Sequence, residues 1–202
     1  MNVRKRILLL IATYLTMLFC AVTVNAASST TKNKATSAFK SFLKRFSYNS
    51  NSYKYFGTYD ITRDGIKELI IGYGDEGGKF AVYQYKNGKL QLCGTDTTMF
   101  GLEIHNVKSG RYSYPSKCLQ SSWIRHISAE RWYYTISKGK LKKVYLAAYG
   151  SRWDGTYKYH SFKGKDISLS RYNKIVTEFN RGTSTFRLRR ITSANIAAYG
   201  RA

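Results

Sequence analysis

The sequence has little proline, few acidic residues and only three histidines. A single proline among 202 residues excludes a proline-rich linker, and the 16 glycines follow no three-residue period, which excludes a collagen-like rod. The histidines (His105, His126 and His160) form no His-Glu-x-x-His or His-x-His pattern, so a zinc-hydrolase signature is missing. Hydrophobic residues make up 43% of the chain, which excludes a disordered basic tail. One globular domain is expected at this length.

The scarcity of acidic residues leaves a large excess of positive charge. The chain has 34 Lys and Arg against 11 Asp and Glu, a formal net charge of +23. A charge of this size creates a long-range potential that attracts polyanions. Binding of that kind weakens as salt rises, because it is driven largely by the release of counterions. The composition therefore predicts an anionic macromolecule as the partner.

The N-terminal segment is organised like a secretory signal. Basic residues at positions 4–6 precede an apolar run from Ile7 to Val24, and small residues follow at Ala26 and Ala27. Residues 1–26 are therefore predicted to be a signal peptide, and the mature protein to be secreted, with association with the cell wall as an option. An uncleaved membrane anchor is the alternative, because the run approaches the ~20 residues that span a bilayer. No transmembrane segment is expected after cleavage.

Two cysteines, Cys93 and Cys118, remain once Cys20 has left with the signal peptide. In an oxidising compartment such a pair predicts a disulfide, which would stabilise the fold by ~3 kcal/mol through the loop that it closes. The alternative is two buried free thiols that pack as small hydrophobic groups. The sequence leaves both open.

The mature chain is predicted to consist of a short leader and one domain. Residues 27–36 are small, polar and basic, and we expect a flexible basic leader there, followed by a single α+β domain over residues 37–202. A second helix is predicted between Ser168 or Ser170, either of which can cap it, and Gly182, which ends it. Apolar residues at helical spacing predict an amphipathic first helix that packs on the domain or lies on a membrane surface: Ala38, Phe39, Phe42, Leu43 and Phe46.

The region between these helices has the pattern of antiparallel strands. A unit of an aromatic strand, a glycine turn and a return strand recurs three times, with turns at Asn87-Gly88, Lys138-Gly139 and Lys163-Gly164. Asn-Gly is typical of two-residue hairpin turns. The repeats are spaced too irregularly for a solenoid. We therefore expect an α+β fold in which an antiparallel β meander carries an N-terminal amphipathic helix and a C-terminal helix.

The most informative motif is the loop 60–68, in which oxygen-bearing side chains alternate along the chain. Calcium takes six to eight oxygen ligands, and this spacing turns alternate residues toward one point, with Gly65 at the sharp bend. Arg63 and Lys67 add positive charge, so any cation site is expected to be weak. The alternative is a structural loop whose carboxylates accept backbone N–H bonds. The candidate metal ligands are Asp60, Thr62, Asp64, Ile66 through its carbonyl, and Glu68.

This loop is similar to the D-x-D-x-D-G-x-x-[DE] loop of FG-GAP, or integrin-like, repeats. The stretch 55–92 resembles a pattern in secreted proteins of Gram-positive gut bacteria, Y-x-x-x-D-I-x-x-D-G-x-x-E-L-I followed by Y-x-Y-K-N-G-K-L. The resemblance covers about 38 residues and implies secretion and a calcium-type hairpin loop, but no activity. Thr62 stands where such loops usually have Asp or Asn, and Ile71 at the twelfth position excludes an EF-hand.

Groupings of residues that could form an active site are weak. A thiol nucleophile would pair Cys118 with His126, oriented by Glu130 or Asp154, but eight residues of separation do not establish a dyad. Carboxylates for glycoside hydrolysis would come from Asp154, Glu130 and Glu103, none of which has distinctive neighbours. The chain is therefore predicted to be non-enzymatic, with a secreted cell-wall hydrolase as the alternative.

Basic residues gather in two stretches, each interleaved with aromatic side chains. For an exported protein, the expected partner of such a surface is an anionic cell-wall polymer or an acidic glycan. Nucleic acid is not expected in that compartment. An inhibitor or toxin-like protein that binds an acidic protein partner is a further alternative. The candidate polyanion-binding residues are Lys138, Lys140, Lys142, Lys143, Arg181, Arg187, Arg189 and Arg190.

Overall fold

A computed structural model shows twelve strands and three helices within the residues that it describes, which are 27–49, 53–73, 78–98, 102–106, 117–125, 128–151, 158–163, 165–181, 183–186 and 188–200. The predicted signal peptide, residues 1–26, lies outside these ranges. None of the described helices is long and apolar enough to cross a membrane.

The strands form two sheets in which every pairing is antiparallel. The first sheet has the order β12 (Arg189–Arg190), β1 (Tyr55–Tyr59), β2 (Glu68–Gly72), β3 (Gly78–Lys86) and β4 (Lys89–Thr98). The second sheet has the order β10 (Lys165–Asp166), β9 (Lys158–Phe162), β8 (Lys140–Ser151), β7 (Ser128–Ser137), β6 (Lys117–Arg125), β5 (Glu103–Asn106) and β11 (Thr183–Thr185). Consecutive strands are neighbours in both, so the predicted α+β fold with an antiparallel meander is confirmed.

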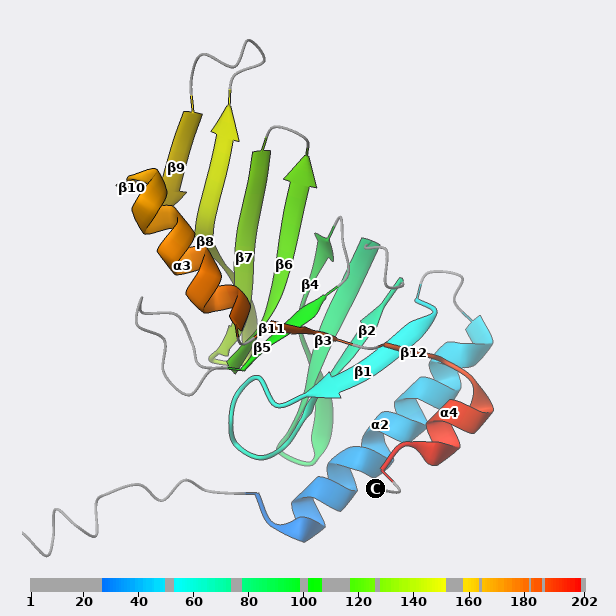
Figure 1. The fold of residues 1–202 in the computed structure, drawn as a ribbon. Helices are drawn as coiled ribbons and strands as arrows, with labels where there is room; N and C mark the ends of the chain where they lie inside the picture. The colour runs from blue at the N-terminus through cyan, green and yellow to red at the C-terminus, as the bar shows by residue number, and fades with distance from the viewer. Residues whose placement is uncertain are drawn as a thin grey trace, which may run out of the picture.

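The sheets and helices are stacked in four layers. Helices α2 (Ser29–Asn49) and α4 (Ser193–Ala198) cover the outer face of the first sheet, and α3 (Leu169–Arg181) covers the outer face of the second (Figure 1). Alternate residues of β2 face opposite ways, since Leu69 packs with α2 whereas Ile70 packs toward the second sheet. The rings of Phe80 and Tyr134 meet edge to face at 5.2 Å between the two sheets.

Helix α2 begins earlier than the sequence pattern predicted. The predicted leader, residues 27–36, is mostly helical, because Ser28 caps the helix: its Oγ accepts the N–H of Thr31 at 3.2 Å. Nothing between Ser29 and Asn49 breaks a helix, and Ala35 extends the buried apolar face by one turn toward the N-terminus. The N–H of Ala27 donates to the carbonyl oxygen of Asp64 at 3.1 Å, so the start of this segment is held against the loop 60–68.

The three predicted repeat units are three hairpins. Two-residue turns join β3 to β4 and β7 to β8, and in both the first turn residue is left-handed, with φ of 53° at Asn87 and 52° at Lys138. Lys163, between β9 and β10, has φ of 49°. Glycine follows each of them in the sequence, and glycine suits the positive φ that a type I′ turn has at its second central residue. The hairpin predictions are confirmed.

The C-terminal part ties the layers together. Helix α3 begins as predicted, since Ser168 Oγ accepts the N–H of Arg171 at 3.3 Å. The chain then pairs with β5 through β11, buries Phe186 between the sheets and pairs with β1 through β12. Between Phe186 and the start of α4, the strand β12 is limited to Arg189 and Arg190.

Candidate functional site

The loop 60–68 connects β1 to β2 and closes on itself through Glu68. Glu68 Oε2 accepts the backbone N–H of Ile61 at 2.7 Å and that of Thr62 at 3.4 Å. Its other oxygen, Oε1, accepts the hydroxyl of Thr62 at 2.9 Å. Glu68 is only 2% exposed, so its carboxyl lies under the loop. Glu68 is the first residue of β2, and its carboxyl thus ties the beginning of the loop, at Ile61 and Thr62, to that strand.

The two aspartates are used in the same way. Asp60 Oδ2 accepts the N–H of Gly65 at 3.3 Å, and Asp64 Oδ1 accepts the N–H of Ile66 at 2.8 Å. The second oxygen of Asp60 is buried and has no hydrogen-bond partner among the described residues. Each carboxylate therefore supports the backbone of the loop, as the structural alternative for this sequence predicted.

In this conformation, the side chains expected to hold calcium bond mainly to their own loop. Both oxygens of Glu68 accept hydrogen bonds from loop donors, one of them from the Thr62 hydroxyl. No group of three His, Cys, Asp or Glu side chains suited to a metal is found in the described part of the chain. We therefore base no function on calcium at Asp60, Thr62, Asp64, Ile66 and Glu68.

Burial changes the acidity of Glu68. Desolvation raises its pKa from 4.5 to about 7, and the charge of Asp64 adds to the rise. The hydrogen bonds from Ile61 and Thr62 act in the opposite direction and are outweighed. At neutral pH this group is therefore partly protonated, which further weakens it as a ligand for a hard cation.

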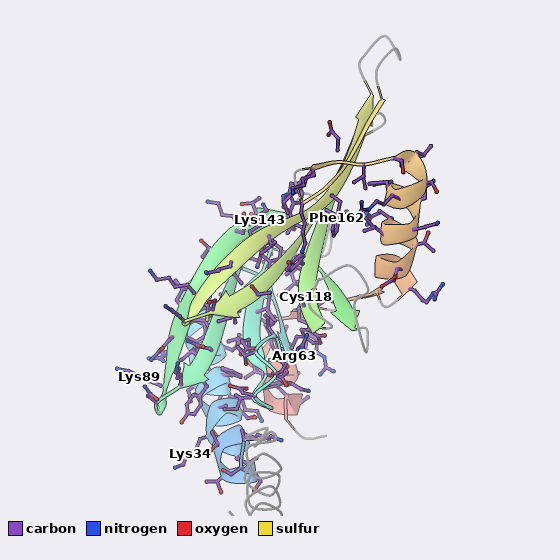
Figure 2. All side chains as sticks on the ribbon, turned by 90° about the vertical axis from the view of Figure 1, so that its left-hand side faces the viewer. Lys34, Arg63, Lys89, Cys118, Lys143 and Phe162 are labelled. Atoms are coloured by element: carbon purple, nitrogen blue, oxygen red, sulfur yellow. The ribbon has the colours of Figure 1, made fainter. Side chains whose placement is uncertain are left out.

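The two cysteines are free thiols, as the second alternative from the sequence predicted, and they lie in different layers. Cys93 is buried between the two sheets, whereas Cys118 is buried between the second sheet and α3 (Figure 2). The disulfide alternative is therefore not what the structure shows. Burial raises the pKa of Cys118 to about 12, so its thiol is protonated at neutral pH and is a poor nucleophile. His126 and Asp154, the other parts of the thiol-dyad hypothesis, lie outside the described residues.

The first predicted basic stretch forms the β7–β8 hairpin. Lys138, Lys140 and Lys142 are exposed, but Lys143 bridges the two sheets: its Nζ lies 3.1 Å from Asp96 Oδ2 on β4 and 4.6 Å from the centre of the Trp132 ring. Lys143 is therefore a structural residue as well as a charge.

A second hairpin adds lysines that the sequence analysis did not connect with these. The tips of the β3–β4 and β7–β8 hairpins lie close together. A Cβ atom added at Gly139 on one tip would come within 2.9 Å of Gln84 Nε2, near the other tip. Lys89 stands at the tip of the β3–β4 hairpin, with Lys86 across the turn (Figure 2). A cavity of about 540 Å³ between the tips and the loop 60–68 is lined by Lys86 and Lys138, and also by Asp64 and Glu68. We call the five exposed lysines of the two tips the hairpin lysines: Lys86, Lys89, Lys138, Lys140 and Lys142.

The second predicted basic stretch, which begins at Arg181 and ends at Arg190, does not lie next to the hairpin lysines. Arg189 and Arg190 lie on β12, which is the edge of the first sheet opposite to β4. Arg190 hydrogen-bonds to the side chain of Tyr55, an interaction that raises its pKa. Arg181 is exposed at the end of α3, and Arg187 lies outside the described residues.

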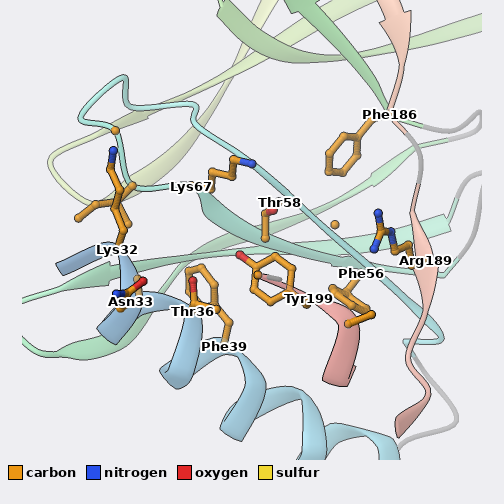
Figure 3. Close-up of a pocket in the computed structure, with 16 residues that line it drawn as sticks. Lys32, Asn33, Thr36, Phe39, Phe56, Thr58, Lys67, Phe186, Arg189 and Tyr199 are labelled. Carbon is orange, nitrogen blue, oxygen red and sulfur yellow. The ribbon is translucent and has the colours of Figure 1, made fainter. Parts of the chain in front are cut away.

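A second cavity, of about 560 Å³, lies on the other side of the loop 60–68, between α2, β1 and the end of α4. Lys32, Lys67 and Arg189 line it, together with the polar side chains of Asn33, Thr36, Thr58 and Tyr199 (Figure 3). We call it the cationic pocket. Of these residues, only Arg189 was predicted from the sequence to bind a polyanion, because the others are spread from position 32 to position 199.

Comparisons with family models, with curated proteins and with solved structures found no match.

Proposed function

We propose that the protein binds an anionic polymer, a cell-envelope polymer or an acidic glycan, through the hairpin lysines. The observation that carries the proposal is the convergence of two hairpin tips that are about fifty residues apart in sequence. Each tip projects exposed lysines, and within the described residues no salt bridge is found for any of the five. Charges that are exposed and have no acidic partner are available to an external anion.

A chain of repeated anionic groups suits this surface better than one small anion does. Exposed lysines are strongly hydrated and flexible, so each contributes little alone, and affinity comes from several contacts and the counterions that they release. The net charge of +23 adds long-range attraction from the rest of the molecule. Both effects depend on the spacing of charge along the polymer rather than on its sequence.

The predicted signal peptide supports an envelope or glycan partner. An exported cationic protein first meets polymers whose repeating units carry phosphodiester, carboxylate or sulfate groups. Trp132 lies under Lys143, the residue that follows Lys142 in the sequence, and its half-buried ring adds contact area for sugar units.

The proposal is tested by retention of the mature domain on heparin and on purified cell walls that carry teichoic acid. The triple variant K138Q/K140Q/K142Q is expected to elute at clearly lower salt than the unchanged protein. The slope of log affinity against log salt should also become shallower, by roughly one for each lysine that no longer neutralises an anionic group of the polymer.

The matched control is K54Q/K165Q/K174Q, which removes the same charge from exposed positions before β1, on β10 and on α3. It should elute near the unchanged protein. Equal losses of retention in the two triple variants would mean that net charge alone holds the polymer. Retention that is insensitive to salt would contradict the proposal altogether.

A further inference from the structure

We propose that the cationic pocket is a discrete binding site for a single tetrahedral oxyanion, a phosphate or sulfate group, carried on a sugar or polyol. The inference rests partly on the proposed function, since such a group would be an end or branch of the anionic ligand. It is carried by separate residues and can fail separately.

The charge of the pocket comes from three elements that meet only in the folded chain. Lys32 lies in the first turn of α2, Lys67 just before β2, and Arg189 on β12. Lys67 and Arg189 reach toward the cavity from opposite sides, and Lys32 stands at its rim (Figure 3). None of the described residues that line the pocket is acidic. The positive charge is therefore not neutralised from within.

The polar part of the wall is organised around Tyr199. Its hydroxyl hydrogen-bonds to the side chains of Thr36 and Thr58, which places three hydroxyl groups together (Figure 3). Burial raises the pKa of Tyr199, so this hydroxyl stays neutral. Neutral hydroxyls can donate to the oxygens of an anion, and Arg189 offers the planar pair of donors that suits phosphate and sulfate oxygens.

The shape of the pocket is set by rigid contacts. The floor is formed by buried aromatic side chains, of which Phe56 is 1% and Phe39 1% exposed. Phe186 packs directly on Gly57, where an added Cβ would lie 2.6 Å from its ring. At the end of α4, Gly200 has φ of 76° and lies against Thr36. A volume of about 560 Å³ leaves room for a substituent on the anion.

The carboxylates nearest in sequence are directed elsewhere. Glu68 follows Lys67 but lies buried on the opposite side of the loop, bonded to Ile61 and Thr62. Asp64 lines the other cavity, between the hairpin tips. Glu68 and Asp64 thus line the cavity at the hairpin tips and not the cationic pocket, which favours anion entry into the pocket.

The test is calorimetric titration of the mature domain with four probes. Inorganic phosphate and glycerol 3-phosphate represent the phosphate source, and inorganic sulfate and glucosamine 6-sulfate represent the sulfated-glycan source. We expect binding of at least one pair, and at least tenfold weaker binding of that pair by K67Q/R189Q, because each substitution removes one charge-assisted hydrogen bond. The stronger pair identifies the source.

The control is K79Q/R190Q, which removes equal charge from exposed positions on β3 and on β12 itself. It should bind within twofold of the unchanged protein. All four side chains are exposed, so thermal unfolding is expected to show that both double variants remain folded. No binding of any probe at millimolar concentration, or equal weakening in both double variants, would overturn the inference.

The two proposals are separated by crossing the variants. If K138Q/K140Q/K142Q loses the polymer and keeps the small anion, while K67Q/R189Q loses the small anion, both proposals stand. If that triple variant keeps the polymer while K67Q/R189Q loses the small anion, the proposed function fails and the pocket stands. If K67Q/R189Q binds the small anion like the unchanged protein, the pocket fails whatever happens to the polymer.

Discussion

At the scale of single residues, Glu68 shows how burial changes the meaning of a motif. Its position in the sequence is that of a metal ligand, yet its carboxyl is buried and accepts three hydrogen bonds from its own loop. The hydrogen bonds from Ile61 and Thr62 to this carboxyl fix the conformation of the loop, which is the role that a bound ion would have. Desolvation then raises the pKa to about 7, and this makes the stability of the domain depend on pH.

The direction of that dependence follows from proton binding. Between about 4.5 and about 7 the folded protein keeps the Glu68 proton, whereas the unfolded chain has lost it. The free energy of unfolding therefore falls as pH rises through this window, by about 3 kcal/mol in order of magnitude, and changes no further above it. The full stabilisation is present below about 4.5.

We expect E68Q to remove this part of the pH dependence while it keeps an acceptor for the Ile61 N–H. The measurement is the free energy of unfolding by denaturant, for the unchanged protein and for E68Q, at pH 5 and at pH 8. The control D166N changes an exposed acid and should follow the unchanged protein. A pH 5 to pH 8 difference that is the same in E68Q would show that Glu68 ionises normally in the fold.

At the scale of elements, the hairpin turns differ in backbone strain, because the residue with positive φ differs from one turn to the next. The turn Asn87-Gly88 has a residue that tolerates left-handed backbone, whereas Lys138 adopts the same conformation without such help. The hairpin with the less favourable turn also presents three of the hairpin lysines. The positive charge of Lys138 at this turn is therefore accompanied by a lower free energy of unfolding than Asn would give.

We expect K138N to raise the free energy of unfolding by about 0.5 kcal/mol, because Asn is strained less than Lys at positive φ. The reverse change at the equivalent turn position, N87K, should lower it by a similar amount. Both are measured by thermal or denaturant unfolding. A less stable K138N, or a more stable N87K, would contradict the argument from backbone conformation.

At the scale of the whole molecule, the charge that attracts a polyanion also opposes folding. The net charge of the full chain is +23, and without the three basic residues of the predicted signal peptide it is +20. Such a charge repels itself in the compact state more than in the expanded unfolded chain. The four layers must therefore be held mainly by the two apolar interfaces on either side of the first sheet and by the packing of α3.

We expect the melting temperature to rise by several degrees between about 50 mM and 500 mM sodium chloride, because salt shortens the range of this repulsion to a few ångströms. Thermal unfolding monitored by circular dichroism measures it. Potassium chloride should act equally, since the effect is one of ionic strength. A melting temperature that falls with either salt would mean that attractive pairs, such as Lys143 with Asp96, outweigh the repulsion.

The parts of the fold that could be predicted are those set by short stretches of chain. The turn at Asn87-Gly88 and the cap at Ser168 act over a few residues, so the hairpins and α3 were found in the sequence. The start of α2 was missed because polar helix residues carry no apolar period, although Ser28 was a visible cap signal. The candidate site was found only in part, since Lys32 and Lys67 stand in no cluster along the chain.

The sequence by itself determined the positive charge, the antiparallel strands, the hairpin turns and the presence of helices near both ends, because composition and local backbone preference do not depend on distant contacts. The tertiary structure alone decided that Glu68 is buried, that Cys93 and Cys118 occupy different layers, and that Lys32, Lys67 and Arg189 line one cavity. These outcomes depend on how two sheets and three helices stack, and stacking joins residues that are more than a hundred positions apart.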